Sequence, residues 1–196
     1  MNGRRSIHAA PIKFGVLAAI VAGSASADSQ QQYRYEGAGP LQSVTIPSED
    51  KVGQCVLSEE FTVAGLRLGD PPAALDRLGA PRGLTRGYGE DDGGGYTAYT
   101  YRYDGLAVEI VRDMVDVIAA AGPGRATPSG IHVGITRADV IRLLGRLPDY
   151  DYATSTGYSF PACQPPDGRN WSFMYFELNF DIDDRLAAIR LVADLP

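Results

Sequence analysis

The stretches GLRLGDPPAALDRLGAP (65–81) and GIHVGITRADVIRLLGRLP (130–148) follow nearly the same pattern. Each has a glycine, a short alternating apolar segment, a second glycine, a helix-start signal, a short apolar helix, and then Leu-Gly and a proline. They recur at a period of about 65–70 residues, which is typical of a duplicated supersecondary unit. The pattern therefore predicts two copies of one small structural unit.

The start and stop signals predict one helix in each copy. The first is expected to begin at Asp70, an N-cap that is followed by proline, and to end at Gly79. The second is expected to begin at Thr136, which forms a capping-box-like pair with Asp139, and to end at Gly145. In both copies the closing glycine supplies the usual C-cap.

Alternating apolar sequence follows each predicted helix and predicts antiparallel strands. The expected strands are residues 96–103, 106–110, 114–119, 174–180 and 186–192. Asp104-Gly105 is the strongest hairpin-turn signal in the chain. One helix followed by two or three antiparallel strands, occurring twice, predicts an α+β fold of two helix-plus-antiparallel-sheet repeats, with the helices packed on one face of the sheet.

Two segments interrupt this pattern and are predicted to be loops. Residues 88–95 are acidic and glycine-rich, and residues 148–170 are long for a connection within a domain. Long loops are functional or disordered more often than short ones, and aromatic side chains in a surface loop have no core to fill. The second loop therefore predicts a partner-binding surface, although packing under the helices is an open alternative. Its four aromatic candidates are Tyr150, Tyr152, Tyr158 and Phe160.

The first 27 residues are typical of a secretory signal peptide. Arg4, Arg5 and Lys13 form a basic region, an apolar run follows, and Ala25-Ser26-Ala27 is an A-x-A cleavage site. A transmembrane anchor is the alternative, but the run is shorter than the roughly 20 residues that a span needs. Arg4-Arg5 leaves the twin-arginine route open beside the general one. We expect a periplasmic or secreted protein.

The remaining chain is predicted to form one domain with three parts. These are a polar arm (28–53) with a short strand near residues 44–46, repeat one (54–122) and repeat two (123–196). Loss of residues 1–27, which carry three basic and no acidic side chains, would change the net charge from −6 to −9. An acidic chain argues against nucleic acid, which needs a basic face, and favours a basic protein partner, unless the charge serves solubility alone.

Two cysteines, Cys55 and Cys163, are expected to form a disulfide in an exported chain. The alternative, a catalytic thiol, would depend on His132 and on a third orienting group.

The sequence offers little for catalysis. It has no G-x-S-x-G elbow, no P-loop and no H-E-x-x-H. The acidic clusters 90–92 and 181–184 could hold calcium, but acidic turns explain them more simply. We therefore expect no catalytic residue, no metal and no cofactor, while a pair of carboxylates for glycoside hydrolysis stays open.

The segment G134-I-T-R-A-D-V-I-R-L-L-G145, with Pro148, resembles the SmpA/OmlA family of small outer-membrane assembly lipoproteins, and residues 69–81 resemble a second copy. A tandem of such units is similar to the beta-lactamase inhibitor protein fold, which implies a concave binding surface. The chain departs from the family in having no lipid-attachment cysteine at the cleavage site, and no functional residue is carried over.

Together these features predict an exported, non-catalytic protein-binding domain that acts in envelope assembly or as an inhibitor or immunity protein. The alternatives are a cell-wall-directed hydrolase and a self-associating structural component of the envelope. No stable membrane span is expected after signal cleavage.

Overall fold

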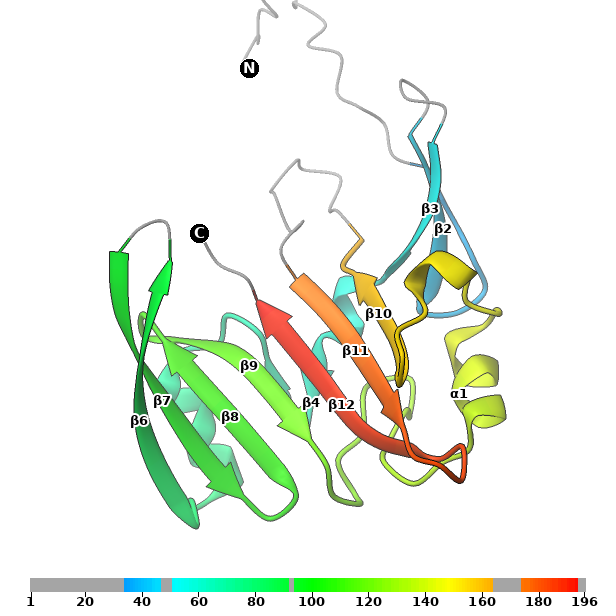
Figure 1. Ribbon diagram of the computed structural model, residues 1–196. Coiled ribbons are helices and arrows are strands. Elements are labelled where there is room, and N and C mark those ends of the chain that lie inside the picture. The colour runs from blue at the N-terminus through cyan, green and yellow to red at the C-terminus, as the bar shows by residue number, and fades with distance from the viewer. Residues whose placement is uncertain (1–33, 47–50, 92–93, 164–173, 194–196) are drawn as a thin grey trace, which may run out of the picture. The chain divides into compact units, whose positions relative to one another are not determined.

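Alternation of apolar and polar residues builds a seven-stranded antiparallel sheet. In β11 (Met174–Phe180), for example, Phe176 and Leu178 are fully buried, whereas Tyr175, which precedes Phe176, is exposed. The spatial order of the strands is β10 (Gly157–Pro161), β11, β12 (Leu186–Ala193), β9 (Met114–Ala120), β8 (Leu106–Val111), β7 (Gly94–Tyr103) and β6 (Gly83–Asp91) (Figure 1). The computed structural model describes residues 34–46, 51–91, 94–163 and 174–193, so the predicted signal peptide (1–27) lies outside the described residues.

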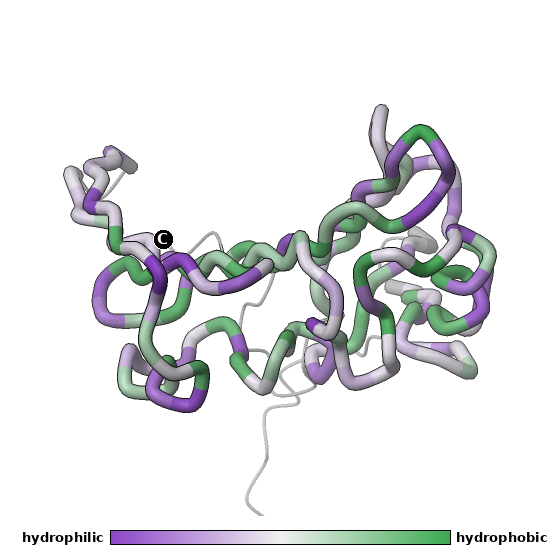
Figure 2. Tube along the Cα trace, turned by 90° about the horizontal axis from the view of Figure 1, so that it is seen from below, coloured by the Kyte–Doolittle hydropathy of each residue, from purple (hydrophilic) through white to green (hydrophobic). Residues whose placement is uncertain are grey.

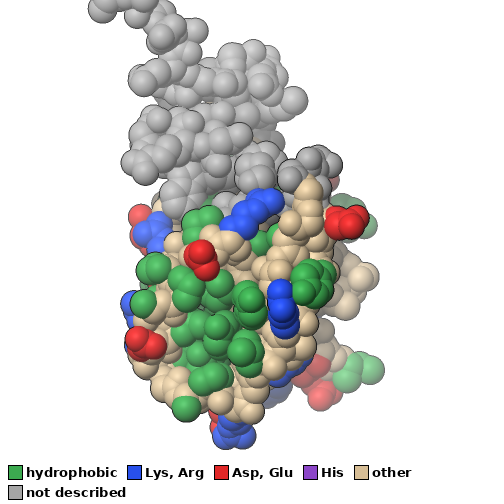
Figure 3. Space-filling view, turned by 90° about the vertical axis from the view of Figure 1, so that its left-hand side faces the viewer, with side chains coloured by type: hydrophobic (Ala, Val, Ile, Leu, Met, Phe, Trp, Pro, Cys, Tyr) green, Lys and Arg blue, Asp and Glu red, His purple; other side chains and the backbone are tan. Residues whose placement is uncertain are grey.

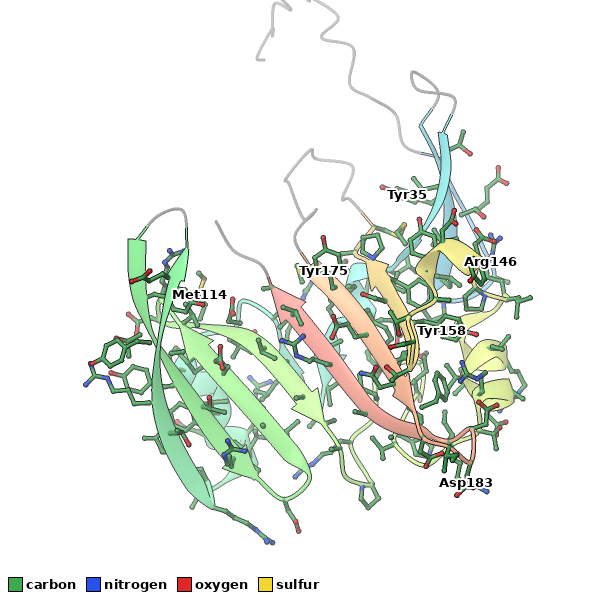
Figure 4. The ribbon with its side chains drawn as sticks, in the orientation of Figure 1. Tyr35, Met114, Arg146, Tyr158, Tyr175 and Asp183 are labelled. Carbon is green, nitrogen blue, oxygen red and sulfur yellow. A yellow bond between two sulfur atoms is a disulfide. The ribbon has the colours of Figure 1, made fainter. Side chains whose placement is uncertain are left out.

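Two smaller antiparallel sheets accompany the large one. The first consists of β1 (Arg34–Glu36), β2 (Leu41–Ile46) and β3 (Lys51–Val56), and the second of β4 (Thr62–Val63) and β5 (Leu66–Arg67). The described part of the predicted polar arm is therefore a sheet, and the strand expected near residues 44–46 is confirmed within β2. The guanidinium of Arg146 donates to the Ser43 hydroxyl and ties β2 to the segment after the helix (Figure 4).

The helices are short. They are η1 (Ser58–Glu60), η2 (Pro72–Leu78), α1 (Arg137–Leu144) and η3 (Tyr150–Tyr152), of which α1 alone among the described residues is an α-helix. The capping prediction for α1 is confirmed, because the Asp139 amide donates to Thr136 Oγ1 at 3.2 Å and Gly145 closes the helix in the left-handed conformation. Residues 72–78 form a 3₁₀ helix instead of the predicted α-helix.

The predicted α+β fold of two helix-plus-sheet repeats is wrong. The protein is mostly β, its helices are short, and the long strands after both helical segments belong to one continuous sheet. The joint is the pairing of β9 with β12, where Ala120 lies opposite Ile189 and Ile118 opposite Leu191. Backbone pairing through this joint, and not the packing of helices on two separate sheets, organises the fold.

The predictions of individual strands are more accurate than the prediction of the fold class. Every predicted strand is confirmed, as is the hairpin turn at Asp104-Gly105. The two predicted loops are wrong in part. Residues 88–91 continue β6, which begins at Gly83, and residues 157–161 form β10.

A single hydrophobic cluster fills the space between the helices and one face of the large sheet. It takes Phe61 from the segment before β4, Leu75 from η2, Val140 from α1 and Phe176 from β11. The rings of Phe61 and Phe176 meet edge to face, with 5.8 Å between their centroids. Because one cluster contacts elements from both ends of the described chain, the sheet and its helices form one cooperative core.

We predict that Gly157→Ala is strongly destabilising. A Cβ atom at residue 157 would collide with the backbone carbonyl of Leu178 on the neighbouring strand β11, and a backbone atom cannot move aside as a flexible side chain can. Overpacking of this kind should lower the free energy of unfolding by at least about 2 kcal/mol. Chemical denaturation would measure the loss.

The matched control is Gly83→Ala in β6, where a Cβ would meet nothing within 4 Å. It should change the free energy of unfolding by less than about 0.5 kcal/mol. Equal losses in the two variants would contradict the packing of β10 against β11.

Candidate functional site

The two edges of the seven-stranded sheet differ. At the β10 edge, Ala162 forms a parallel bridge with Val56 of β3, and the Cys163 amide donates to the Val56 carbonyl at 2.8 Å. The predicted disulfide between Cys55 and Cys163 is confirmed and fixes this contact, with 4.8 Å between the Cα atoms. The β10 edge is therefore partly covered, by β3 just beyond its last residue and by the bridge from Ala153 to Tyr158 within it.

The β6 edge is open. β6 pairs with β7 over nine residues without a register shift, and no other strand of the described chain pairs with its outer side (Figure 1). Natural edge strands are usually protected by charged side chains, proline, a bulge or short length. β6 carries the charged residues Arg86 and Glu90, but it has no proline or bulge and is nine residues long, so it presents a row of backbone donors and acceptors that a further strand could use.

The register places the larger side chains of β6 on one face. Arg86 lies opposite Tyr99 and Leu84 lies opposite Tyr101, and directly opposed residues share a face. Since side chains alternate along a strand, Tyr88 and Glu90 lie on this same face. The other face of β6 carries small residues, namely Gly83, Thr85, Gly87 and Gly89.

An apolar surface lies beside this open edge. Leu84, Tyr88 and Tyr99 are 57%, 76% and 37% exposed, and Figure 3 shows hydrophobic side chains gathered into a continuous area on this side of the protein. The Arg86 guanidinium lies 4.9 Å from the Tyr88 ring centroid and 6.0 Å from that of Tyr99. We call Leu84, Arg86, Tyr88 and Tyr99 the β6–β7 patch. Clustered exposed apolar side chains are a mark of interaction sites.

A hollow of about 300 Å³ adjoins the patch at the turn between β8 and β9. It is lined by Gly95, Tyr96, Thr97, Tyr99, Ile110, Arg112 and Asp113. The Arg112 guanidinium lies 5.9 Å from the centroid of the Tyr96 ring. A hollow of this size and mixed lining can accept one protruding side chain of a bound protein.

Tyr103, the last residue of β7 before the turn into β8, adds no charge near the patch. Burial raises the pKa of the Tyr103 phenol above its ordinary value, and the neighbouring Tyr101 and Asp76 raise it further. Tyr103 therefore stays neutral at physiological pH and adds no charge beside the patch.

Three of the four predicted partner-binding aromatic residues lie together, one fully buried and two partly buried. Phe160 is fully buried, and the rings of Tyr152 and Tyr158 stack on it with centroid distances of 5.6 and 5.9 Å. Tyr158 also lies under the Arg137 guanidinium of α1, 5.5 Å from ring centroid to Cζ (Figure 4). A partner-binding role for Phe160 is therefore corrected to a core role, and Tyr152 and Tyr158 support that core.

Tyr152 is held by a buried glutamine that the sequence analysis missed. The backbone N–H of Gln54 donates to the Tyr152 hydroxyl at 2.8 Å, and the side-chain oxygen of Gln54 accepts a hydrogen bond from the backbone N–H of Asp149 at 2.6 Å. Gln54 is 1% exposed. The segment around η3 is thus anchored to β3. Tyr150, at 91% exposed, is the most exposed of the four predicted aromatic residues.

The candidate catalytic and metal-binding groups have local structural roles. His132 Nδ1 lies 2.8 Å from the Gly130 carbonyl. The Asp181 carboxylate accepts from the amides of Asp183 and Arg185 within the turn, and Asp184 pairs with Arg137 at 2.6 Å. Among the described residues no group of three or more histidine, cysteine or acidic side chains is placed to hold a metal ion.

The functional candidates that sequence reasoning missed are the large residues of β6. Their signal was the alternation Leu84, Arg86, Tyr88, Glu90, with small residues between them. Glycine and acidic residues in the second half of the strand predict a loop over residues 88–95, and this prediction hides the alternation that includes Tyr88.

The described strands and helices define a mostly β protein with one disulfide and an exposed apolar patch at one end of its sheet. No protein-family model and no curated protein matches the chain. It is similar in structure to a cysteine-rich secretory protein from Staphylococcus aureus subsp. aureus Mu50, with a TM-score of 0.48 and 13% identity over 70% of this chain. The match covers 48% of that protein, so this chain spans about half its length.

Two further findings concern location. In the described part of the chain, no helix is long and apolar enough to span a membrane. Among the residues that Figure 2 colours, hydrophobic residues occur in short runs separated by hydrophilic ones. The disulfide is compatible with an extracellular or periplasmic location, where such bonds persist.

Proposed function

We propose that this is an exported periplasmic protein that binds another protein without catalysis, and that the β6–β7 patch is its contact surface. The exposed apolar side chains beside an open sheet edge are the observation that carries this proposal. Roles in envelope assembly and in the inhibition of a partner both fit it. The resemblance to the SmpA/OmlA family stays a prediction.

The chemistry of the patch supports a protein partner, and the net charge of the chain, not the cationic Arg86 of the patch, supports a basic one. Tyrosine supplies a large, rigid contact area with a polar tip, and the Arg86 guanidinium already stacked on two rings needs no ordering on binding. The net charge of −6 over the whole chain would draw a basic protein toward the surface from a distance.

The test compares three forms of the protein, immobilised and exposed to a periplasmic extract. Leu84→Ser with Tyr99→Ser removes apolar area from the patch without adding charge. Tyr150→Ser removes one exposed tyrosine far along the chain and is the matched control. We expect one protein to be retained by the wild type and by the control, and its retention to fall at least about tenfold in the patch variant.

Salt gives a second readout on the same resin. A basic partner held in part by charge should be retained at about 50 mM salt and largely released at about 500 mM. If the patch variant retains the partner as well as the wild type does, the binding surface is not the β6–β7 patch. If Tyr150→Ser loses binding, the surface includes the η3 segment. If the wild type retains no protein at low salt, the proposal fails.

A further inference from the structure

The open edge strand carries a charge pattern that is complementary to itself. Arg86 and Glu90 are four residues apart on the same face of β6, and Tyr88 lies midway between them. One side chain is cationic, the other is anionic, and the residue at the centre is aromatic. Reversing the strand direction exchanges the two charges and leaves the centre unchanged.

We propose that β6 pairs antiparallel with β6 of a second copy of this chain, about a two-fold axis through Tyr88. In this register Arg86 lies opposite Glu90 of the second copy, Glu90 lies opposite its Arg86, and the two Tyr88 side chains meet at the axis. Opposite charges and aromatic pairs directly across two strands each contribute to pairing. Residues 85–91 of each copy would be joined by backbone hydrogen bonds.

The other two-fold registers are less favourable. Because the same faces must coincide, the strand can slip only so that the axis passes through another residue of β6. An axis through Arg86 or through Glu90 places like charges opposite each other, which is destabilising. An axis through Gly87 or Gly89 places neither ion pair in register. Tyr88 is thus the centre that the charges select.

The second face of β6 carries glycine at the middle of the strand. The proposed register sets Gly87 against Gly89 of the second copy. A Cβ at residue 87 would meet nothing within 4 Å, whereas a Cβ at residue 89 would meet the ring of Tyr96, which lies opposite on β7. The space beside Gly87 is therefore open on this face, and the charged and aromatic side chains of the first face guide the pairing.

The second copy is a partner beyond the one proposed above, and the inference does not depend on that function. An antiparallel two-fold axis runs perpendicular to the sheet, so both β6–β7 patches would lie on the same side of the joined sheets. The dimer would present two adjoining patches to any further partner.

The test is the mass of the purified protein in solution, which contains no other protein. Sedimentation velocity at about 1–100 µM should show a wild-type dimer that dissociates on dilution. Arg86→Glu alone and Glu90→Arg alone should each weaken dimerisation at least about tenfold, because each sets like charges opposite each other. The double variant with both changes should restore the dimer.

The matched control is Arg102→Glu, which reverses an exposed charge on β7 and should leave the dimer intact. A wild type that is monomeric throughout, or single variants that dimerise as well as the wild type, would overturn the proposal. So would a double variant that is folded and monomeric.

A cross-link decides the register even if a charge variant folds poorly. Tyr88→Cys, oxidised under mild conditions, should give a disulfide-linked dimer, since residue 88 meets itself at the axis within reach of a disulfide. Thr100→Cys, on the inner strand β7, should not. Cross-linking of Thr100→Cys with none of Tyr88→Cys would refute the pairing. Capture of a heterologous partner by monomeric Glu90→Arg, whose change lies outside the β6–β7 patch, would show that the proposed function holds without the dimer.

Discussion

Removal of the Cys55–Cys163 disulfide should lower the free energy of unfolding by about 4–5 kcal/mol, because the bond closes a loop of roughly a hundred residues in the unfolded chain. The separation of the two cysteines is 108 residues. Both side chains are buried, at 3% and 6% exposed, so Cys55→Ala with Cys163→Ala also loses packing. Urea unfolding of this double variant and of the wild type would measure the difference.

Reductant supplies the control for this prediction. It should destabilise the wild type to nearly the level of the double variant and leave the double variant unchanged. A loss below about 1 kcal/mol would mean that β3 and β10 hold together without the covalent link, or that the unfolded chain keeps them close.

Phe176→Ala should cost about 3–5 kcal/mol, the range for deleting a fully buried phenylalanine. Phe176 has no exposed surface, lies on β11 inside the sheet, and meets the ring of Phe61 edge to face. The cavity would open where the large sheet contacts the segment before β4. Chemical denaturation measures the loss.

Tyr175→Ala is the control for this core substitution, since the next residue of the same strand points to the opposite face and is 37% exposed. Its cost should stay below about 1 kcal/mol. Combining Phe61→Ala with Phe176→Ala should reveal a coupling of about 0.5–1.5 kcal/mol between the two rings. Strictly additive losses would mean that the ring contact contributes nothing beyond burial.

The locally encoded features could be predicted from the sequence. The Asp104-Gly105 turn and the capping of α1 by Thr136 depend on residues within a few positions of each other, and the structure contains both. Strands with strict alternation, such as 174–180, were predictable for the same reason. In each case the residues that signal the element also make its contacts.

The first helical segment shows where local signals mislead. Asp70 was predicted to be the N-cap, but its carboxylate accepts from the Arg67 amide at 3.0 Å and stabilises the turn before the helix. Two prolines then begin a segment that closes as a 3₁₀ helix. With one helix of two turns and the other tightened, strands dominate the fold, which is why the α+β prediction failed.

The remaining differences arise from contacts between residues far apart in the sequence. β6 forms despite its glycines because β7, rich in β-forming tyrosine and threonine, pairs with every residue of it. The aromatic residues after α1 are drawn inward because Gln54, about a hundred positions earlier, satisfies the Tyr152 hydroxyl and the Asp149 amide. Neither contact has a signature that a local pattern can reveal.

The partly covered β10 edge limits how far strand addition could go. Ala162 bridges β3, the disulfide fixes that contact, and Ala153 bridges Tyr158, so the β6 edge is the more accessible end of the large sheet. Association through β6 would pair this edge in both molecules, so a third molecule could not add to it. Pairing of the long, exposed edge strand β6 in a dimer would thus disfavour the growth of fibres through that edge.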